Sequence, residues 1–156
     1  MSETHPSIKH LFEPQSVAVI GASTDVGKIG YKIVDNIVSG GYEGKIYPIN
    51  PKGGEVCGRR AYRDLSEIKG GIDLATVVIP AKYVFDAVKK CAHAGVKYLS
   101  IITSGFSEVG NLEEEKNIVE FSNAHGMRVL GPNIFGIFSA NARLNATFGP
   151  KNILPG

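Results

Sequence analysis

The stretch Val17-Ala-Val-Ile-Gly-Ala-Ser-Thr-Asp-Val-Gly-Lys-Ile-Gly30 decides the fold of this chain. Its first four apolar residues are too few for a helix but suit a short buried strand of a parallel sheet. Gly21 ends that strand, and apolar residues recur at helical spacing from Ile29 to Val38.

A strand that turns through glycines into a helix brings free backbone N–H groups and the positive end of a helix dipole to one point. We therefore expect an anion site here. The glycine spacing is not that of the GxGxxG fingerprint, so a tight turn without a ligand is the alternative.

Composition narrows the class of protein. The 156 residues suit a single domain, and a net charge of +2 without any basic run argues against nucleic-acid binding through bulk electrostatics. No apolar stretch is long enough for a membrane span, and the N-terminus is too polar for a signal peptide. Two cysteines without a CxxC motif predict neither a disulfide framework nor a metal site, and we expect a cytoplasmic protein. Cys91 falls on the apolar face of a helix and is expected in the core, whereas Cys57, in a glycine-rich connection, could be a reactive thiol.

Strands and helices alternate along the rest of the chain. This alternation predicts an α/β fold, a Rossmann-like doubly wound parallel sheet in a three-layer αβα single domain, with strand order 3-2-1-4-5. Pro48 indicates that the second strand is not hydrogen-bonded on both sides throughout its length. We assign residues 1–15 to a lead-in, 16–148 to the domain, and 149–156 to a linker toward a second domain that this chain lacks. The predicted strands are 17–20, 45–49, 73–79, 98–102 and 127–130, and the predicted helices are about 27–39, 81–94 and 112–124.

The loops that follow the strands carry the functional signal. In an open α/β sheet these loops line one crevice at the carboxyl ends of the strands. NAD sites normally place Asp or Glu at the end of the second strand, but this chain has Asn50 there, followed by Lys52. A cation at that position fits a phosphorylated ribose, as in NADP or coenzyme A, whereas a solvated surface lysine is the alternative. The loops concerned are 21–30, 50–54, 79–82, 102–108 and 131–136.

Several motifs, in order along nearly the whole chain, resemble the N-terminal CoA-binding domain of the nucleoside-diphosphate-forming acyl-CoA synthetases. That superfamily includes ADP-forming acetate–CoA ligase and the alpha subunit of succinyl-CoA synthetase. The matching stretches are Phe12-Glu-Pro-Gln-Ser-Val-Ala-Val-Ile-Gly-Ala-Ser23, Gly27-Lys-Ile-Gly30, Tyr47-Pro-Ile-Asn-Pro-Lys52, Thr103-Ser-Gly-Phe-Ser-Glu108 and Gly131-Pro-Asn133 with Gly136.

The resemblance implies a coenzyme A site made of four groups of residues. Gly21, Ser23, Gly27, Lys28 and Gly30 would hold the pyrophosphate, and Asn50, Pro51 and Lys52 would hold the ribose 3′-phosphate. Val78, Ile79, Pro80 and Lys82 would flank the adenosine. Ile102, Thr103 and Ser104 would lie along the pantetheine, with Asn133 near the thiol.

The chain departs from the family pattern in two places. Ile134 follows Asn133 where the family commonly has cysteine, which affects local packing only. The family's phosphorylated histidine belongs to a second domain, and no histidine here (His5, His10, His93 and His125) matches it.

We therefore predict no catalytic residue in this segment. In the complete enzyme, acyl-CoA, ADP and phosphate would give acid, CoA and ATP, with further domains or subunits carrying the phosphohistidine and the ADP site. The alternative is a CoA-binding or nucleotide-binding regulatory module without catalysis, either free-standing or fused to a protein acetyltransferase. A third interpretation, an NADP-dependent reductase, is disfavoured because the chain contains no identifiable set of catalytic residues for that reaction.

Overall fold

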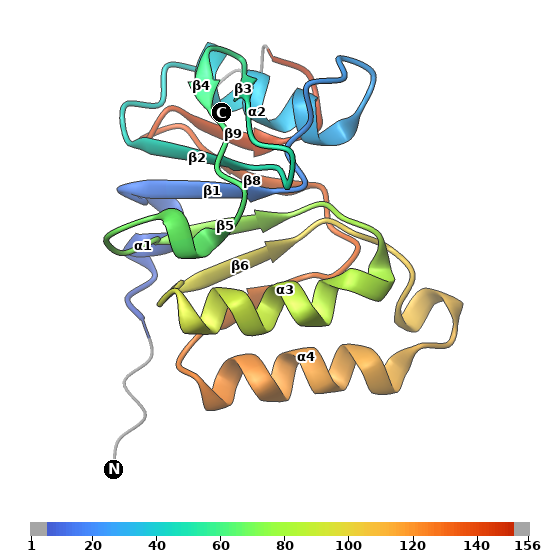
Figure 1. Cartoon of the computed structure of the whole chain (residues 1–156). Coiled ribbons are helices and arrows are strands. Elements are labelled where there is room, and N and C mark those ends of the chain that lie inside the picture. The colour runs from blue at the N-terminus through green and yellow to red at the C-terminus, as the bar shows by residue number, and fades with distance from the viewer. Residues whose placement is uncertain (1–5, 152–156) are drawn as a thin grey trace.

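Five parallel strands form the central sheet of the structure, a computed structural model that describes residues 6–151 (Figure 1). All five predicted strands are present, with ends that differ from the expected ones by at most two residues. They are β1 (Ser16–Ile20), β2 (Lys45–Ile49), β5 (Leu74–Val77), β6 (Tyr98–Ile101) and β7 (Arg128–Leu130). The three central strands, β1, β5 and β6, are buried along their whole length, as parallel strands covered on both faces require, whereas the edge strands β2 and β7 are partly exposed.

The strand order is β2-β1-β5-β6-β7, so the predicted order 3-2-1-4-5 is wrong. The third strand of the sheet in sequence, β5, pairs with β1 instead of with β2, in a parallel register that sets Val17 opposite Leu74. The indication from Pro48 is confirmed, because β2 is an edge strand of this sheet. The same proline argues against the predicted order, which would have placed the second strand between two neighbours. From β1, the chain adds β2 on one side of the sheet and β5, β6 and β7 on the other. The gap between β1 and β5 is therefore a topological switch point, where open α/β sheets bind ligands.

Both faces of the sheet are covered, which confirms the α/β class. Helix α2 (Ile29–Ser39) covers one face, together with an antiparallel hairpin of β8 (Gly136–Ser139) and β9 (Leu144–Thr147). Helices α3 (Ala81–His93) and α4 (Leu112–Ala124) cover the other face. Figure 1 shows these helices on opposite sides of the strands. The sequence did not indicate the β8–β9 hairpin, which occupies part of the layer that a second helix would fill.

Short elements complete the chain. Between β2 and β5 lie a small hairpin of β3 (Glu55–Val56) and β4 (Arg59–Arg60) and a 3-10 turn, η1 (Leu65–Glu67). A second turn, η2 (Ser107–Val109), precedes α4. No helix within residues 6–151 is long and apolar enough to cross a bilayer.

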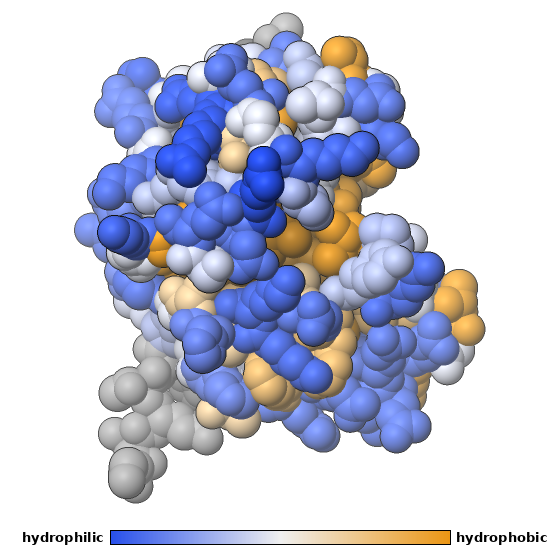
Figure 2. Space-filling model, viewed as in Figure 1, coloured by the Kyte–Doolittle hydropathy of each residue, from blue (hydrophilic) through white to orange (hydrophobic). Residues whose placement is uncertain are grey.

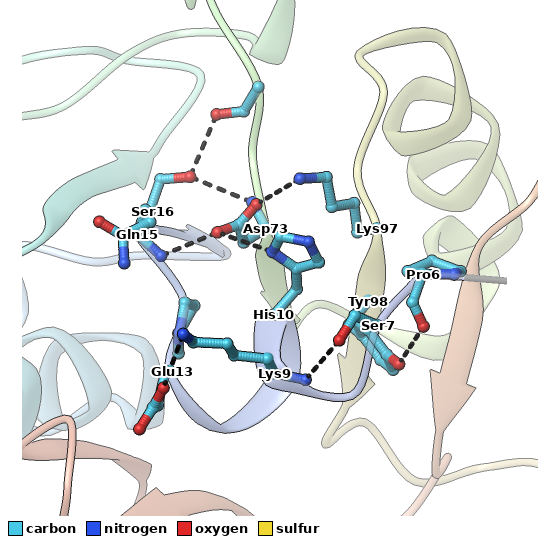
Figure 3. Close-up of polar contacts among 12 residues, drawn as sticks. Pro6, Ser7, Lys9, His10, Glu13, Gln15, Ser16, Asp73, Lys97 and Tyr98 are labelled. Carbon is cyan, nitrogen blue, oxygen red and sulfur yellow. Dashed lines mark hydrogen bonds and ion pairs between the residues drawn. The ribbon is translucent and has the colours of Figure 1, made fainter.

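A buried carboxylate joins the lead-in to the amino ends of the strands (Figure 3). Asp73 accepts a hydrogen bond from the backbone N–H of Gln15 at 2.8 Å, and it pairs with Lys97 at 3.0 Å and with His10 of α1 (Lys9–Phe12) at 3.5 Å. Burial disfavours the charged form of Asp73, but the Gln15 hydrogen bond and the Lys97 and His10 contacts outweigh it and hold the pKa of Asp73 below its ordinary value. This network fixes α1 at the end of the sheet that is remote from the predicted crevice.

Gly149 and Lys151, at the start of the predicted linker, contact α2. The buried Asn36 of α2 donates hydrogen bonds to the carbonyl oxygens of Thr147 and Gly149, both at 2.9 Å. Lys151 pairs with Asp35 at 2.6 Å. These contacts hold the chain on α2 up to residue 151, and residues 152–156 lie outside the described residues.

Candidate functional site

A cavity of about 620 Å³ opens at the carboxyl ends of β1, β5 and β6. Its volume is typical of a small-molecule site. It brings together most of the residues predicted for the pyrophosphate, adenosine and pantetheine of coenzyme A. These are Gly21, Ser23, Gly27, Lys28, Gly30, Val78, Ile79, Pro80, Ile102, Thr103, Ser104 and Asn133.

The amino end of α2 faces this cavity without a side-chain cap. Lys28 is the N-cap residue in extended conformation, and no side chain accepts a hydrogen bond from the first turn. The first backbone N–H groups of a helix have no partner within the helix, and the helix dipole makes this end positive. A helix end of this kind can accept an anion, and the anion site expected from the sequence stays a prediction.

The backbone N–H of Gly27, a residue predicted to hold the pyrophosphate, already donates a hydrogen bond within this loop. The Asp25 carboxylate accepts from the Gly27 N–H at 2.9 Å, and the Ser23 hydroxyl accepts from the Asp25 N–H at 3.0 Å. These bonds shape the loop between β1 and α2. An anion at the amino end of α2 therefore has the first-turn N–H groups available, while the Gly27 N–H is satisfied by the chain itself.

Two glycines let this loop approach its neighbours. Gly21 has φ of +102°, and a Cβ there would overlap the Val78 carbonyl of the adjacent loop. A Cβ on Gly30 would overlap the Gly21 carbonyl. The first turn of α2 can therefore lie directly on the end of β1, which places its N–H groups at the mouth of the crevice.

Thr103 stabilises the side of the cavity that is formed by the loops after β5 and β6. Its hydroxyl donates to the Ile79 carbonyl oxygen at 2.7 Å and accepts from the Ile79 N–H at 3.2 Å. Both bonds tie the loop after β6 to the loop after β5. Asn133 donates its backbone N–H to the Thr103 carbonyl oxygen at 3.0 Å, and its side chain is exposed.

A second, apolar cavity of about 370 Å³ adjoins the first one. The two cavities share Gly21, Ile79 and Pro80, which lie at the switch point between β1 and β5. Figure 2 shows apolar surface in a hollow of this face, above the position of α3 in Figure 1. Besides the shared residues, the second cavity is lined by Ile20, Ile49, Pro51, Arg63, Asp64, Leu65, Tyr83, Asp86, Ala87 and Lys90.

Three predicted residues lie outside both cavities. The Asn50 side chain donates to the Ala22 carbonyl oxygen at 3.0 Å and accepts from the Lys52 N–H at 2.9 Å, so it joins the loops after β1 and β2. Lys52 is exposed on the β2 loop, next to Pro51. Lys82, in the first turn of α3, lies over the Tyr83 ring at 5.0 Å from its centroid.

Sequence reasoning missed several residues that line the cavities. Phe148 follows β9 and reaches the larger cavity, where its ring contacts Phe135 at 4.5 Å between centroids. Its neighbours Thr147 and Gly149 are the residues held by Asn36. Ile29, Ala81 and Ile134 also line the larger cavity, and each is adjacent in sequence to a predicted site residue.

The cysteines and the described histidines take structural positions. Cys91 is fully buried, as expected. Partial burial raises the pKa of Cys57 despite a hydrogen bond with Tyr31, which disfavours a reactive thiolate. His93 ends α3 and His125 caps α4, as predicted, and none of the three histidines within residues 6–151 lines either cavity. His5 lies outside the described residues.

Comparison with known families defines the class to which this fold and site belong. Residues 15–139 match the family model described as a CoA binding domain. The chain is therefore a member of the CoA-binding domain family.

Individual relatives narrow this class to one group of enzymes. The chain is 51% identical to the alpha subunit of ADP-forming acetate–CoA ligase I of Pyrococcus furiosus, over 96% of this chain and 34% of the relative. It is 45% identical to the ADP-forming acetate–CoA ligase of Methanocaldococcus jannaschii, over 90% of this chain and 20% of the relative. The structure of the dinucleotide forming acetyl-coenzyme A synthetase 1 of Candidatus Korarchaeum cryptofilum, in complex with phosphate and ADP, superposes with a TM-score of 0.93. That match is 48% identical and covers 96% of this chain and 32% of the other.

The resemblance inferred from the motifs is thus confirmed. The chain is homologous to the alpha subunits of ADP-forming acetate–CoA ligases, and it spans about a third of the length of the first of these relatives.

Proposed function

We propose that this chain binds coenzyme A or acyl-CoA across the carboxyl ends of its strands. The observation that carries the proposal is the uncapped amino end of α2, which faces a cavity of about 620 Å³ at the switch point of the sheet. A pyrophosphate there would accept hydrogen bonds from the first turn of α2, with the exposed Lys28 beside it. Gly21, Ser23, Gly27 and Gly30 would form the floor of this subsite.

The adenosine would turn toward the second cavity. Val78, Ile79 and Pro80 would lie along it, with Lys82 at its edge, because the loop after β5 separates the two cavities. The apolar lining of the second cavity suits an adenine ring. The ribose 3′-phosphate would then face the β2 loop, where Asn50 and Pro51 shape the backbone that carries Lys52.

The pantetheine would leave in the other direction, along Ile102, Thr103 and Ser104. Thr103 contributes by bracing the loop, since its hydroxyl is occupied by the Ile79 backbone. Asn133 would lie near the thiol, and Phe148 would close the end of the larger cavity.

In a longer protein, this domain would orient the CoA thiol or thioester toward a reaction carried out elsewhere. Orientation of a reactant lowers the barrier of a reaction without acid–base chemistry from the residues that hold it. We propose that further domains or a partner subunit supply the phosphorylated histidine and the ADP site of an ADP-forming acyl-CoA ligase.

The test is a calorimetric titration of the pure chain with CoA, acetyl-CoA and NAD. CoA and acetyl-CoA should bind and NAD should bind far more weakly, because Asn50 and Lys52 stand where an NAD site has a carboxylate. NAD binding as tight as CoA binding would refute the proposal.

A further inference from the structure

Two cations beside the β2 loop have no ion-pair or side-chain hydrogen-bond partner within residues 6–151. One is Lys52, and the other is Arg63, which lines the apolar cavity next to Pro51. Nearby cations are engaged: Arg60 pairs with Glu67 at 3.5 Å, and Lys90 pairs with Asp64 at 3.2 Å. Arg63 is thus a cation at the edge of the cavity whose charge the described chain does not neutralise.

The backbone holds Arg63 in place over the β2 loop. The residue before it, Tyr62, exchanges backbone hydrogen bonds of 2.8 Å with Pro48 and Asn50 along the outer edge of β2. The Arg63 N–H donates to the Glu67 carboxylate at 3.1 Å. The backbone of Arg63 is therefore held at the outer edge of β2 by Tyr62 and on the side of η1 by Glu67, although it belongs to a connection without regular structure.

Gly53 provides the room for the Arg63 side chain. Gly53 is buried and has φ of +68°, and a Cβ added there would lie 3.1 Å from the Arg63 Nε. The guanidinium stem thus lies across the backbone of the residue that follows Lys52. The two free cations flank the same short loop.

We propose that Arg63 binds the ribose 3′-phosphate of CoA together with Lys52, an inference that rests on the CoA site proposed above. A guanidinium can donate two parallel hydrogen bonds to a phosphate, whereas an ammonium acts as a point charge. With the adenine in the apolar cavity that Arg63 lines, the 3′-phosphate would lie between the two cations. Arg63 then contributes to discrimination between CoA and nucleotides that lack this phosphate.

The test compares CoA with dephospho-CoA, which lacks only the 3′-phosphate, in calorimetric titrations of the full chain. Arg63→Gln should weaken CoA binding about tenfold, as expected for one charged hydrogen-bonding partner, and leave dephospho-CoA binding unchanged. Arg63→Lys should retain part of the preference. The matched control is Arg59→Gln, which removes the same charge from β4 at a position that lines neither cavity. Circular dichroism and thermal unfolding would verify that each variant is folded.

Each other outcome has a distinct meaning. An equal loss of affinity for both ligands would show that Arg63 stacks on the adenine. An unchanged preference for CoA would show that Arg63 is a solvated arginine. Either result overturns the inference, and neither contradicts the proposal that the chain binds CoA. A wild type that binds CoA and dephospho-CoA equally would refute the 3′-phosphate subsite alone. A wild type that binds neither would refute the proposed function, and this inference with it.

Discussion

Asn50 and Lys52 are two residues apart, but the structure gives their side chains different roles. Asn50 uses both ends of its amide to join the loops after β1 and β2. Pro51 follows it and restricts Asn50 to an extended conformation. Lys52 is left exposed, with no partner among the described side chains. We infer that Asn50 and Pro51 set the direction of the loop, and that Lys52 supplies its charge.

Lys52 should contribute directly to the affinity for CoA. Lys52→Ala should lower CoA affinity about five- to thirtyfold, because one hydrogen bond between charged groups, from the ammonium to the phosphate, is lost. The affinity for dephospho-CoA should stay near that of the wild type, and a double-mutant cycle between ligand and residue isolates the contact. Lys69→Ala, in a distant exposed loop, serves as the control. A variant that keeps the full preference for CoA would make Lys52 an ordinary surface lysine.

At the scale of elements, the sheet is organised from both of its ends. At the carboxyl ends, Gly21 and Gly30 let α2 approach β1, and Thr103 ties β6 to β5. At the amino ends, Asp73 joins the lead-in, β5 and the start of β6 (Figure 3). The candidate binding site and the Asp73 network lie at opposite ends of the strands, so the Asp73 network can be altered without changing the crevice.

Asp73→Asn should lower the free energy of unfolding by about 1–3 kcal/mol at neutral pH, because Lys97 loses a buried charged partner. The folded-state pKa of Asp73 is lowered relative to its ordinary 3.8. Its contribution is therefore complete above that ordinary value and is lost as the pH falls through the lowered pKa.

Urea unfolding of wild type and Asp73→Asn between pH 7 and pH 2 measures this difference. The gap between the two proteins should be constant at neutral pH and close in acid. Asp86→Asn, in an exposed pair 4.0 Å from Lys90, should change stability by less than about 0.5 kcal/mol. A gap between wild type and Asp73→Asn that is absent at pH 7, or that widens in acid, would contradict this account of the network.

At the scale of the whole molecule, a domain that binds and orients CoA has no need for catalytic groups of its own. The described histidines lie away from both cavities, and the chain spans about a third of its relative from Pyrococcus furiosus. We therefore expect that the chain alone, incubated with acetyl-CoA, ADP and phosphate, forms no ATP above background in a luciferase assay. ATP formation that scales with the concentration of this chain would contradict the division of labour proposed here.

The positions of the helices and strands can be predicted from local sequence signals, whereas the order of the strands in the sheet cannot. Runs such as Val17–Ile20 and helix ends such as Gly95 are defined by adjacent residues, so their positions could be predicted. Strand order depends on pairing between segments far apart in sequence, and only Pro48 carried information about it.

The same limit applies to the site. Residues that follow strands, such as Gly21 and Thr103, could be assigned to the crevice because parallel strands end at one edge. Phe148 and Arg63 could not, because each reaches its cavity through contacts with another segment of the chain that no local pattern shows. Phe148 depends on Asn36, and Arg63 depends on the space left by Gly53.

The position of CoA on the chain can be mapped directly by amide chemical-shift changes in a ¹⁵N-labelled sample. If CoA lies across the carboxyl ends of the strands, the largest changes occur at Gly21, Ile29, Gly30 and Ser104, which line the cavity there. The reference surface is a separate cavity of about 540 Å³ lined by Glu13, Tyr42 and Arg143, among others. Those residues should keep their shifts. Changes centred on the cavity lined by Glu13, Tyr42 and Arg143, with the amino end of α2 unaffected, would show that CoA does not bind across the carboxyl ends of the strands.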